Sequence, residues 1–231
     1  MKMLRTDVRI NDPHHDELHN DERATINTLS TVWAAPPTGN AVVDTGELLS
    51  LLDASPALVL LHPGDYAINA TLERPDRVSV RGAGMGVTRL LYGGSDSCIT
   101  WGNTAYAPTN GMSTRWEGGV LSDLTIVGTA AGRAGVDLTA ATRFVVERVK
   151  VSGFTRGAGF LTRGGSWIYT LRDCIAYACD VGFRAYMTSD LSDYQAVNAA
   201  IISGGEYAAC RVGIQIGDVP PPDEMKLWRI G

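Results

Sequence analysis

A repeated six-residue pattern is the feature of this chain that most restricts how it can fold. Similar segments begin at residues 123, 148, 173 and 200, so the steps are 25, 25 and 27 residues. They read DLTIVG, RVKVSG, DCIAYA and AIISGG. A second series carries a glycine at one fixed place and runs through Ala134–Leu138, Ala158–Leu161, Val181–Arg184 and Val212–Ile216. A fixed period of this length indicates stacked structural repeats.

Each repeat holds at least two short strands, which are too small to bury their apolar side alone. Stacked copies can bury it, and equivalent strands about 4.8 Å apart then form parallel sheets wound into a solenoid. The period lacks the helices of ankyrin and tetratricopeptide repeats, and the L-x-x-L-x-L pattern of leucine-rich repeats is absent. The sequence therefore predicts an all-β chain, folded as a right-handed parallel β-helix of about six coils over residues 57–217.

Alignment of the repeats predicts which side chains stack inside the solenoid. The glycines of the second series suit corners that need a positive φ or a close contact between coils. We expect two inward ladders, one formed by Leu124, Val149, Cys174 and Ile201, the other by Val136, Phe160, Phe183 and Ile214.

The chain changes in character near residue 44. Residues Asp44–Leu52 are expected to form a short apolar helix that covers the open end of the solenoid, with Asp44 as its N-cap. The next strands read LLHPGDYAI (residues 60–68) and RVSVRGAG (residues 77–84). This succession resembles the first coil of the pectate-lyase-like superfamily, which has a capping helix, a hydrophobic-x-Pro-Gly-x-Tyr-x-Ile strand and a V-x-V-x-G-x-G strand. The resemblance covers about residues 44–216 and implies a fold that hosts lyases, hydrolases, epimerases and non-enzymatic adhesins.

Residues 1–43 differ in composition, and we expect them to form a segment separate from the β-helix domain of residues 44–231. The stretch DPHHDELHNDER at residues 12–23 holds three of the four histidines. A sparse helical stripe of Leu18, Ile26, Leu29 and Trp33 follows, and the linker AAPPTGN ends it. One narrow stripe cannot fold alone, so we expect it to assemble with its own copies or with another protein.

The first of these segments also resembles a known class. Asp12, Pro13, His15, Asp16, His19 and Asn20 are similar to a run such as H-x-x-D-H-N that precedes the receptor-binding domain in bacteriophage tail proteins. A β-helix behind such a segment resembles a phage tailspike or tail fibre. The resemblance implies a location in the virion tail, a homotrimer, and attachment to other tail proteins through residues 1–35. His15 and His19 are candidate metal ligands on a trimer axis, although capping of a polar helix also accounts for them.

Composition excludes several other classes. The net charge is −5 with no long basic run, so nucleic acid is not expected as a partner. No stretch approaches the roughly 18 apolar residues of a membrane span, and no secretory signal is visible. The cysteines form no C-x-x-C pair, and we expect Cys98, Cys174, Cys179 and Cys210 to be buried free thiols. No cofactor is indicated.

Four connections are expected on one edge of the solenoid, at residues 102–119, 138–148, 161–173 and 184–200. Insertions on one edge of a repeat protein usually build its binding face. Aromatic rings there suit stacking on sugars, and arginines suit hydroxyl or acidic groups, although the aromatics could instead pack the loops or fill a subunit interface. The candidate ligand-binding residues are Tyr106, Arg115, Trp116, Arg143, Arg163, Trp167, Tyr186 and Tyr194.

Cleavage of a glycan by acid–base chemistry needs two carboxylates, about 5–10 Å apart. The candidates on this edge are Glu117, Asp190 and Asp193. The N-T-D, D-D, G-H-G and R-I-K series of polygalacturonases is missing, as is the R-x-P-x-x-R of pectate lyases. We therefore expect a tail component that binds host-surface polysaccharide, in the virion or otherwise extracellular. A polysaccharide lyase or glycoside hydrolase is the alternative.

Overall fold

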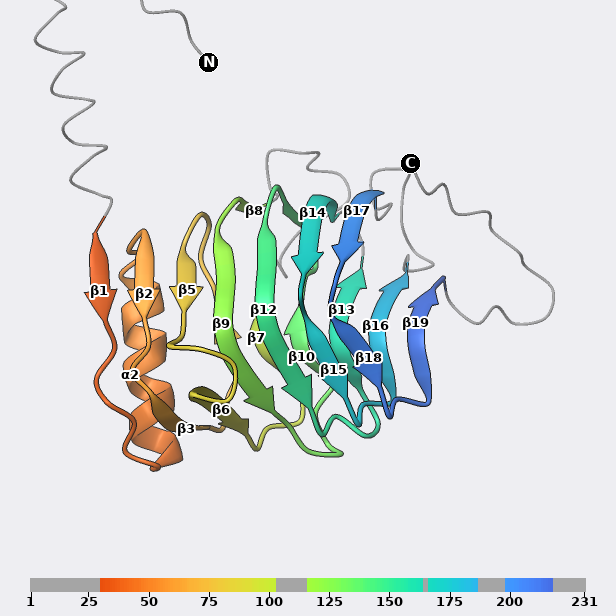
Figure 1. Cartoon of the computed structure of the whole chain (residues 1–231). Coiled ribbons are helices and arrows are strands. Elements are labelled where there is room, and N and C mark those ends of the chain that lie inside the picture. Colours follow the sequence, from red (N-terminus) through yellow and green to blue (C-terminus); the bar gives the residue numbers. More distant parts are fainter. Residues whose placement is uncertain (1–29, 103–115, 164–165, 187–197, 218–231) are drawn as a thin grey trace, which may run out of the picture.

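The computed structural model describes residues 30–102, 116–163, 166–186 and 198–217. Within these ranges, strands of successive coils pair in parallel and stack into a solenoid, with one helix, α2 (Ala41–Asp53), across its first end (Figure 1). The prediction of an all-β parallel solenoid with a short capping helix is confirmed. Every coil advances along one axis, so the side chains of equivalent residues form rows along the length of the molecule.

Two sheets enclose the core. The six-stranded sheet consists of β4 (Leu72–Glu73), β7 (Ser97–Thr100), β10 (Ala134–Asp137), β13 (Ala158–Arg163), β16 (Val181–Tyr186) and β19 (Val212–Ile216). The 13-stranded sheet consists of β1 (Thr31–Trp33), β2 (Leu58–Leu60), β3 (Gly64–Ile68), β5 (Ser79–Arg81), β6 (Thr88–Tyr92), β8 (Trp116–Glu117), β9 (Val120–Val127), β11 (Ala141–Thr142), β12 (Val145–Ser152), β14 (Trp167–Arg172), β15 (Ile175–Tyr177), β17 (Asn198–Ser203) and β18 (Glu206–Ala208).

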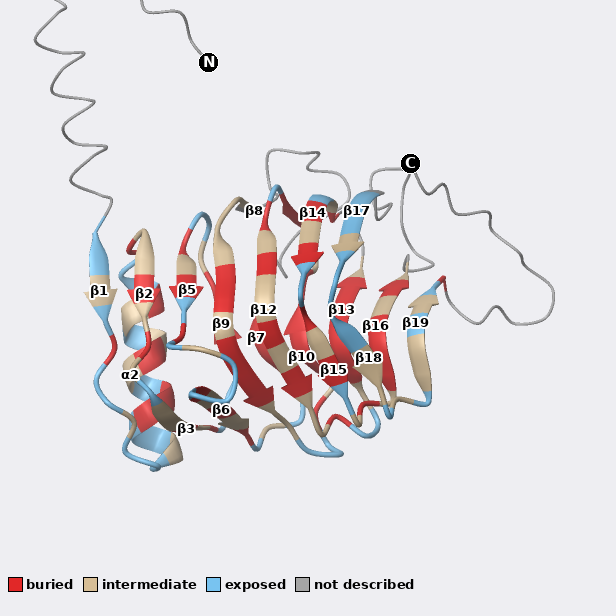
Figure 2. Cartoon of the chain, viewed as in Figure 1, coloured by how far each residue is buried: buried red, intermediate tan, exposed pale blue. Residues whose placement is uncertain are grey.

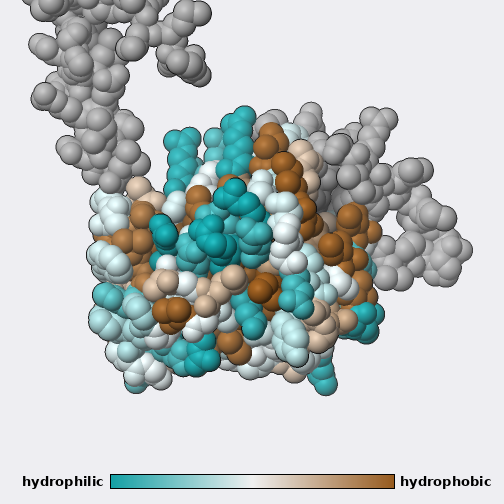
Figure 3. Space-filling model, viewed as in Figure 1, coloured by the Kyte–Doolittle hydropathy of each residue, from teal (hydrophilic) through white to brown (hydrophobic). Residues whose placement is uncertain are grey.

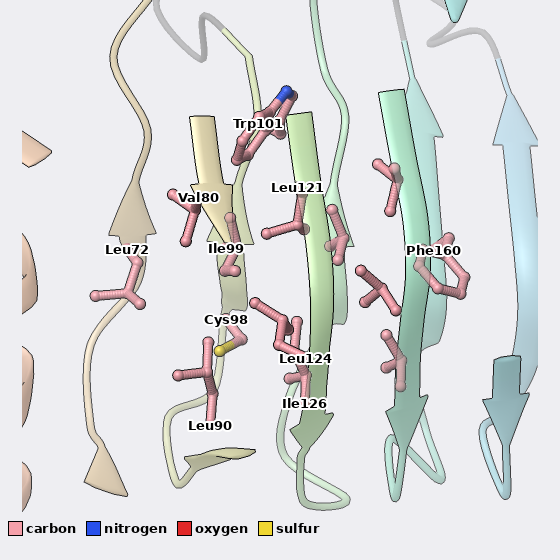
Figure 4. Close-up of a cluster of buried hydrophobic side chains, with 14 of the residues drawn as sticks. Leu72, Val80, Leu90, Cys98, Ile99, Trp101, Leu121, Leu124, Ile126 and Phe160 are labelled. Atoms are coloured by element: carbon pink, nitrogen blue, oxygen red, sulfur yellow. The ribbon is translucent and has the colours of Figure 1, made fainter. Parts of the chain in front are cut away.

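One of the two predicted inward ladders is confirmed. In the six-stranded sheet Val136 pairs with Phe160, Phe160 with Phe183, and Phe183 with Ile214. The first three side chains are buried, whereas Ile214 is 48 % exposed because no described coil covers it. The ladder continues toward the first end through Ile99 and Leu72, which Figure 4 shows among the packed apolar side chains.

The other ladder is correct for three members and wrong for the fourth. Val149 pairs with Leu124, and the pairing of its neighbours places buried Cys174 opposite Val149. Ile201, however, pairs with Thr170 and is 59 % exposed. The true step is 31 residues, since Ile175 pairs with Glu206, and not the 27 that the sequence alignment used. The long connection before β17 contributes the extra residues.

The corners of the coils are formed by stacked residues in the left-handed region. Asp123, Arg148 and Asp173 have φ of 59°, 49° and 53°, and they occupy equivalent corners in successive coils. Gly159 serves a different purpose. A Cβ on it would lie 2.7 Å from the carbonyl oxygen of Gly182 and 2.8 Å from the Cβ of Ala176. Close contact between coils, rather than a positive φ, therefore explains this glycine.

Helix α2 begins one turn earlier than expected. Its N-cap is Asn40, whose side chain accepts hydrogen bonds from the backbone N–H groups of Val42 and Val43 at 3.0 and 3.3 Å. The prediction that Asp44 is the N-cap was wrong, because Asn40 already satisfies the free N–H groups there. The buried Leu48 and Leu52 cover the open end of the core.

Asp44 instead joins three parts of the chain. Its carboxylate accepts hydrogen bonds from Thr38 N and Oγ1 (2.8 and 2.6 Å), Gly39 N (3.1 Å) and Ala67 N (2.9 Å). Burial alone would raise the pKa of Asp44, but these hydrogen bonds outweigh it and lower the pKa. The ionised carboxylate thus fastens α2 to the preceding linker and to β3.

The first described residues belong to the solenoid. Trp33, predicted at the end of a helical stripe, lies in β1, which pairs with β2. Ala34 is buried and its N–H donates to Leu60 O at 2.9 Å, while Tyr66 Oη donates to Ala35 O at 3.0 Å. The rest of the predicted attachment segment, residues 1–29, lies outside the described residues. Figure 2 shows β1 and β19, at the two ends, as less buried than the strands between them.

Candidate functional site

Strands within or at the ends of the four connections named above pair with one another at one edge of the solenoid. β8 pairs with β11, β11 with β14, and β14 with β17, so Trp116 lies opposite Ala141, Thr142 opposite Trp167, and Trp167 opposite Asn198. β8, β14 and β17 lie together at the top of Figure 1. The stacking therefore brings the described ends of the connections onto one edge although they are far apart in sequence.

On this edge Glu117 is surrounded by arginines. Arg143 Nη1 lies 3.2 Å from Glu117 Oε1, and Arg77 Nη2 lies 3.9 Å from Oε2. All three side chains are at least 41 % exposed. Exposed pairs of this kind contribute at most about 1 kcal/mol to stability, so both arginines remain accessible to a ligand at little cost.

Arg163 has a more enclosed setting on the outer side of the six-stranded sheet. Its Nε donates to Thr139 Oγ1 at 2.9 Å, and its Nη2 lies 3.4 Å from Asp137 Oδ2. Asp137, at the end of β10, has no exposed side-chain surface. A buried carboxylate is costly unless it is paired, and here two guanidinium groups share it.

The second guanidinium belongs to Arg133, immediately before β10. Its Nη2 lies 2.6 Å from Asp137 Oδ2 and 2.9 Å from Asp96 Oδ1, and its Nε donates to Ser97 Oγ at 3.2 Å. The register of β7, β10 and β13 brings these groups together, because Ala134 pairs with Ser97 and Asp137 with Leu161. We call this set the Asp137 cluster: Asp96, Ser97, Arg133, Asp137, Thr139 and Arg163.

An aromatic ring adjoins the cluster. Arg163 pairs in register with Tyr186 of β16, and the guanidinium carbon of Arg184 lies 4.9 Å from the centroid of the Tyr186 ring. Tyr186 also packs against a small apolar group on this side of the sheet, made up of Ala134, Ala158, Leu161 and Val181. The outer side of the six-stranded sheet therefore combines arginines, hydroxyls and an aromatic ring.

On the opposite side of the solenoid, three arginines share two carboxylates. Arg81 and Arg148 contact Asp123 at 3.1 and 2.6 Å, and Arg148 and Arg172 both contact Glu147. A patch of hydrophilic side chains lies near the middle of this face in Figure 3. A hollow of about 430 Å³ lies beside it, lined by apolar groups and by Trp33, His62 and Arg81.

Several predicted site residues lie outside the described residues: His15, His19, Tyr106, Arg115, Asp190, Asp193, Tyr194 and the side chain of Trp116. Trp167 is half-buried in β14. Among the described residues, no three His, Cys, Asp or Glu side chains converge as a metal site, and no helix is long and apolar enough to cross a membrane.

Sequence reasoning missed Asp137, Arg133 and Ser97. A signal was present, because the segment AGVDL has a carboxylate where the next coils have Leu161 and Arg184. A charged residue inside an apolar repeat, with an arginine four positions earlier, indicates a specific partner on the outer side of the strand.

Comparison with known proteins shows the fold. No family model and no curated protein sequence matches the chain. Among solved structures, the A-module of the mannuronan C-5 epimerase AlgE6 from Azotobacter vinelandii is similar, with a TM-score of 0.52 and 20 % identity over 74 % of this chain and 54 % of that chain. The AlgE4 A-module from the same organism has a TM-score of 0.50 and 16 % identity over 83 % of this chain and 67 % of that chain.

A third similar structure is ORF18 of Geobacillus virus E2, with a TM-score of 0.46 and 15 % identity over 93 % of this chain and 47 % of that chain. The chain spans about half the length of the first of these structures (54 %). Together with the parallel stacking described above, the two epimerase modules show that the chain has the pectate-lyase-like right-handed parallel β-helix fold.

Proposed function

We propose that this chain binds an acidic host-surface polysaccharide through the outer side of its six-stranded sheet, with the edge connections completing the site. The observation that carries the proposal is the pair of arginines held by the buried Asp137 beside Tyr186. Binding sites for sugars commonly combine planar donors with an aromatic ring.

The hydrogen bonds of the cluster leave part of each guanidinium available. Within the described part of the chain, Arg133 and Arg163 use their Nε and Nη2 groups for Ser97, Asp96, Asp137 and Thr139. The Nη1 group of each remains for a sugar carboxylate or hydroxyl. Because Asp137 fixes both side chains, a ligand would meet arginines that have already lost their conformational freedom.

The fold supports a polysaccharide as the class of ligand. The two epimerase modules are named for mannuronan, a polymer, and they share this solenoid. A β-helix offers a row of equivalent positions along its axis, which suits a chain of repeating sugars. Fold alone does not determine activity, so the site residues carry the assignment.

We further propose that the chain is a tailspike-like or tail-fibre-like component of a phage virion, a homotrimer of β-helices with about six coils each. The N-terminal resemblance to phage tail proteins supports this role, with residues 1–29 as the attachment segment. The boundary is 29 rather than 35 because β1 and Ala34 pack on the solenoid. A variant lacking residues 1–29 should keep its β-sheet circular dichroism and fail to enter virions, and normal incorporation would remove the attachment role.

Binding is tested with polygalacturonate and polymannuronate as acidic probes and dextran as a neutral one. The Arg163→Gln and Arg133→Gln variants should each weaken binding of the acidic probes by about 10-fold or more, as expected for the loss of a charged hydrogen bond. Arg211→Gln is the matched control, since Arg211 pairs with Asp180 at a different corner of the coil. The proposal would be contradicted if the protein bound dextran as tightly as the acidic probes. It would also be contradicted if all three variants lost the same amount of affinity for the acidic probes.

The same samples separate binding from catalysis. A binding protein leaves the number of reducing ends in each probe unchanged over hours of incubation. New reducing ends without unsaturated ends would favour a hydrolase, whereas new reducing ends accompanied by unsaturated ends would favour a lyase. Glu117→Gln would then identify the contribution of the one candidate carboxylate among the described residues.

A further inference from the structure

We propose that Cys179 and Cys210 form a disulfide bond that ties the last described coil to the coil before it. The register places the two residues opposite each other. Tyr177 pairs with Ala208 and Val181 with Val212, each a step of 31 residues, and Cys210 is likewise 31 residues after Cys179. Cys179 lies in the corner between β15 and β16, and Cys210 lies in the equivalent corner between β18 and β19. Backbone hydrogen bonds on both sides of the pair, from Ala178 N to Ala208 O at 3.2 Å and from Val212 N to Asp180 O at 3.0 Å, hold these corners together. Coils stacked at the spacing of parallel strands, about 4.8 Å, place equivalent Cα atoms within the roughly 4.4–6.8 Å that a disulfide spans.

Both sulfur atoms lie on the inner side of the coil. A Cβ on Gly159, which would point into the core, would lie 3.6 Å from Cys179 Sγ. Cys210 Sγ lies 3.4 Å from Ala208 O and 3.7 Å from Ala176 O and packs against the main core. The two thiols are also near enough to interact with each other. They therefore meet between the coils and do not point to opposite sides.

The two cysteines differ in a way that suits stepwise oxidation. Both are free thiols in the structure; Cys179 is buried as expected, whereas Cys210 is only partly buried, so the expectation of burial was wrong for Cys210. The Cys210 thiolate attacks a small-molecule disulfide RSSR, forms a mixed disulfide and releases one RSH. The Cys179 thiolate then attacks the Cys210 sulfur and releases the second RSH. The two thiols lose two protons and two electrons in total, and the RSSR oxidant is reduced to two RSH.

The bond would stabilise the last described coil, which is covered on one side only. β17 and β19, in the last described coil, carry Ile201, Ile214 and Ile216 with about half of each side chain exposed. A coil covered on one side only has fewer contacts than an internal coil and opens more readily. The cross-link would also close a loop of chain that includes Tyr186, which adjoins the Asp137 cluster.

Formation of the disulfide is tested in the full-length native protein by oxidation with oxidised glutathione. The product is then alkylated in denaturant and analysed by peptide mapping. We expect the loss of two hydrogens from the intact monomer and one bridged peptide pair, Cys179 with Cys210. Cys98 and Cys174 serve as internal controls and should be alkylated in full. The oxidised protein should unfold about 5–10 °C higher than the reduced protein.

The pH dependence provides a second measurement. Burial raises the pKa of Cys179 to about 11, so its thiolate is scarce near neutral pH. Closure of the bridge should therefore become faster as the pH rises from about 7 to about 9.

The variants Cys210→Ser and Cys179→Ser should each abolish the mass change and the rise in unfolding temperature. Four alkylated cysteines after oxidation of the native protein, a bridge between any other pair, or a bridge between two chains would overturn the proposal. Peptide mapping of the oxidised protein without substitutions tests the bridge even if a variant fails to fold.

Discussion

Arg148 lies one coil beyond Asp123, and its guanidinium donates to both oxygens of that carboxylate, from Nε at 2.6 Å and from Nη2 at 3.0 Å. Both residues have positive φ at equivalent corners. Arg148 also contacts Glu147, which accepts from Arg172 as well. Side chains thus fasten the outer corner of successive coils, where the backbone is in an unfavourable region.

This network predicts loss of stability in acid. The hydrogen bonds from Arg148 lower the pKa of Asp123, and those from Arg172 and then Arg148 lower the pKa of Glu147. A carboxylate with a lowered pKa stabilises the folded state fully above its unfolded pKa, near 4, and this contribution disappears as the pH falls through the folded value. The free energy of unfolding should therefore decline below about pH 4.

Asp123→Asn isolates the contribution of that carboxylate. It should lower the free energy of unfolding at pH 7 by up to about 1 kcal/mol, since the arginine partners are partly exposed. The difference from the unchanged protein should shrink toward zero below the folded pKa of Asp123, where its carboxylate is protonated in both states. Asp53→Asn is the control, because Asp53 is exposed and forms no ion pair with another described residue. A difference that persists in strong acid would show that charge is not the cause.

The inward ladder predicts a graded response to truncation. Phe160→Ala and Phe183→Ala should each lower the free energy of unfolding by ~3–5 kcal/mol, because each removes a fully buried ring between two coils. Ile214→Ala, at the half-exposed end of the same ladder, should cost about 1 kcal/mol or less. Chemical denaturation of the three variants measures these losses. Equal losses of unfolding free energy in all three would refute the register of the ladder.

Alanine substitutions at two glycines should change the stability of the protein in opposite directions. Gly159→Ala should destabilise the protein by about 1–3 kcal/mol, since the new methyl group would meet the backbone of the next coil. Gly46→Ala should stabilise it by about 0.5–1 kcal/mol, because the exposed position within α2 has open space and alanine favours helix. Thermal unfolding distinguishes the two, and a neutral Gly159→Ala would show that the coils are farther apart than described.

The sequence was sufficient for the parallel solenoid and for the Phe160 ladder, because each glycine of the second series marks the register where two coils meet closely. It failed at Ile201 because the length of the connection before β17 is not encoded in the repeat. It failed at Asp44 because Asn40 and Asp44 are both suitable N-caps, and only the tertiary contact with Ala67 decides between them. The Asp137 cluster depends on side chains from three coils, which no local pattern joins.

The most direct test of the proposed binding side is hydrogen exchange of the backbone amides with and without saturating polygalacturonate. Peptides that cover β10, β13 and the start of the following connections should exchange more slowly when the polymer is present, whereas peptides that cover β5 and the corner at Arg148 should not change. Protection confined to the 13-stranded sheet, or no protection anywhere at a polymer concentration that saturates binding, would contradict a polysaccharide site at the Asp137 cluster.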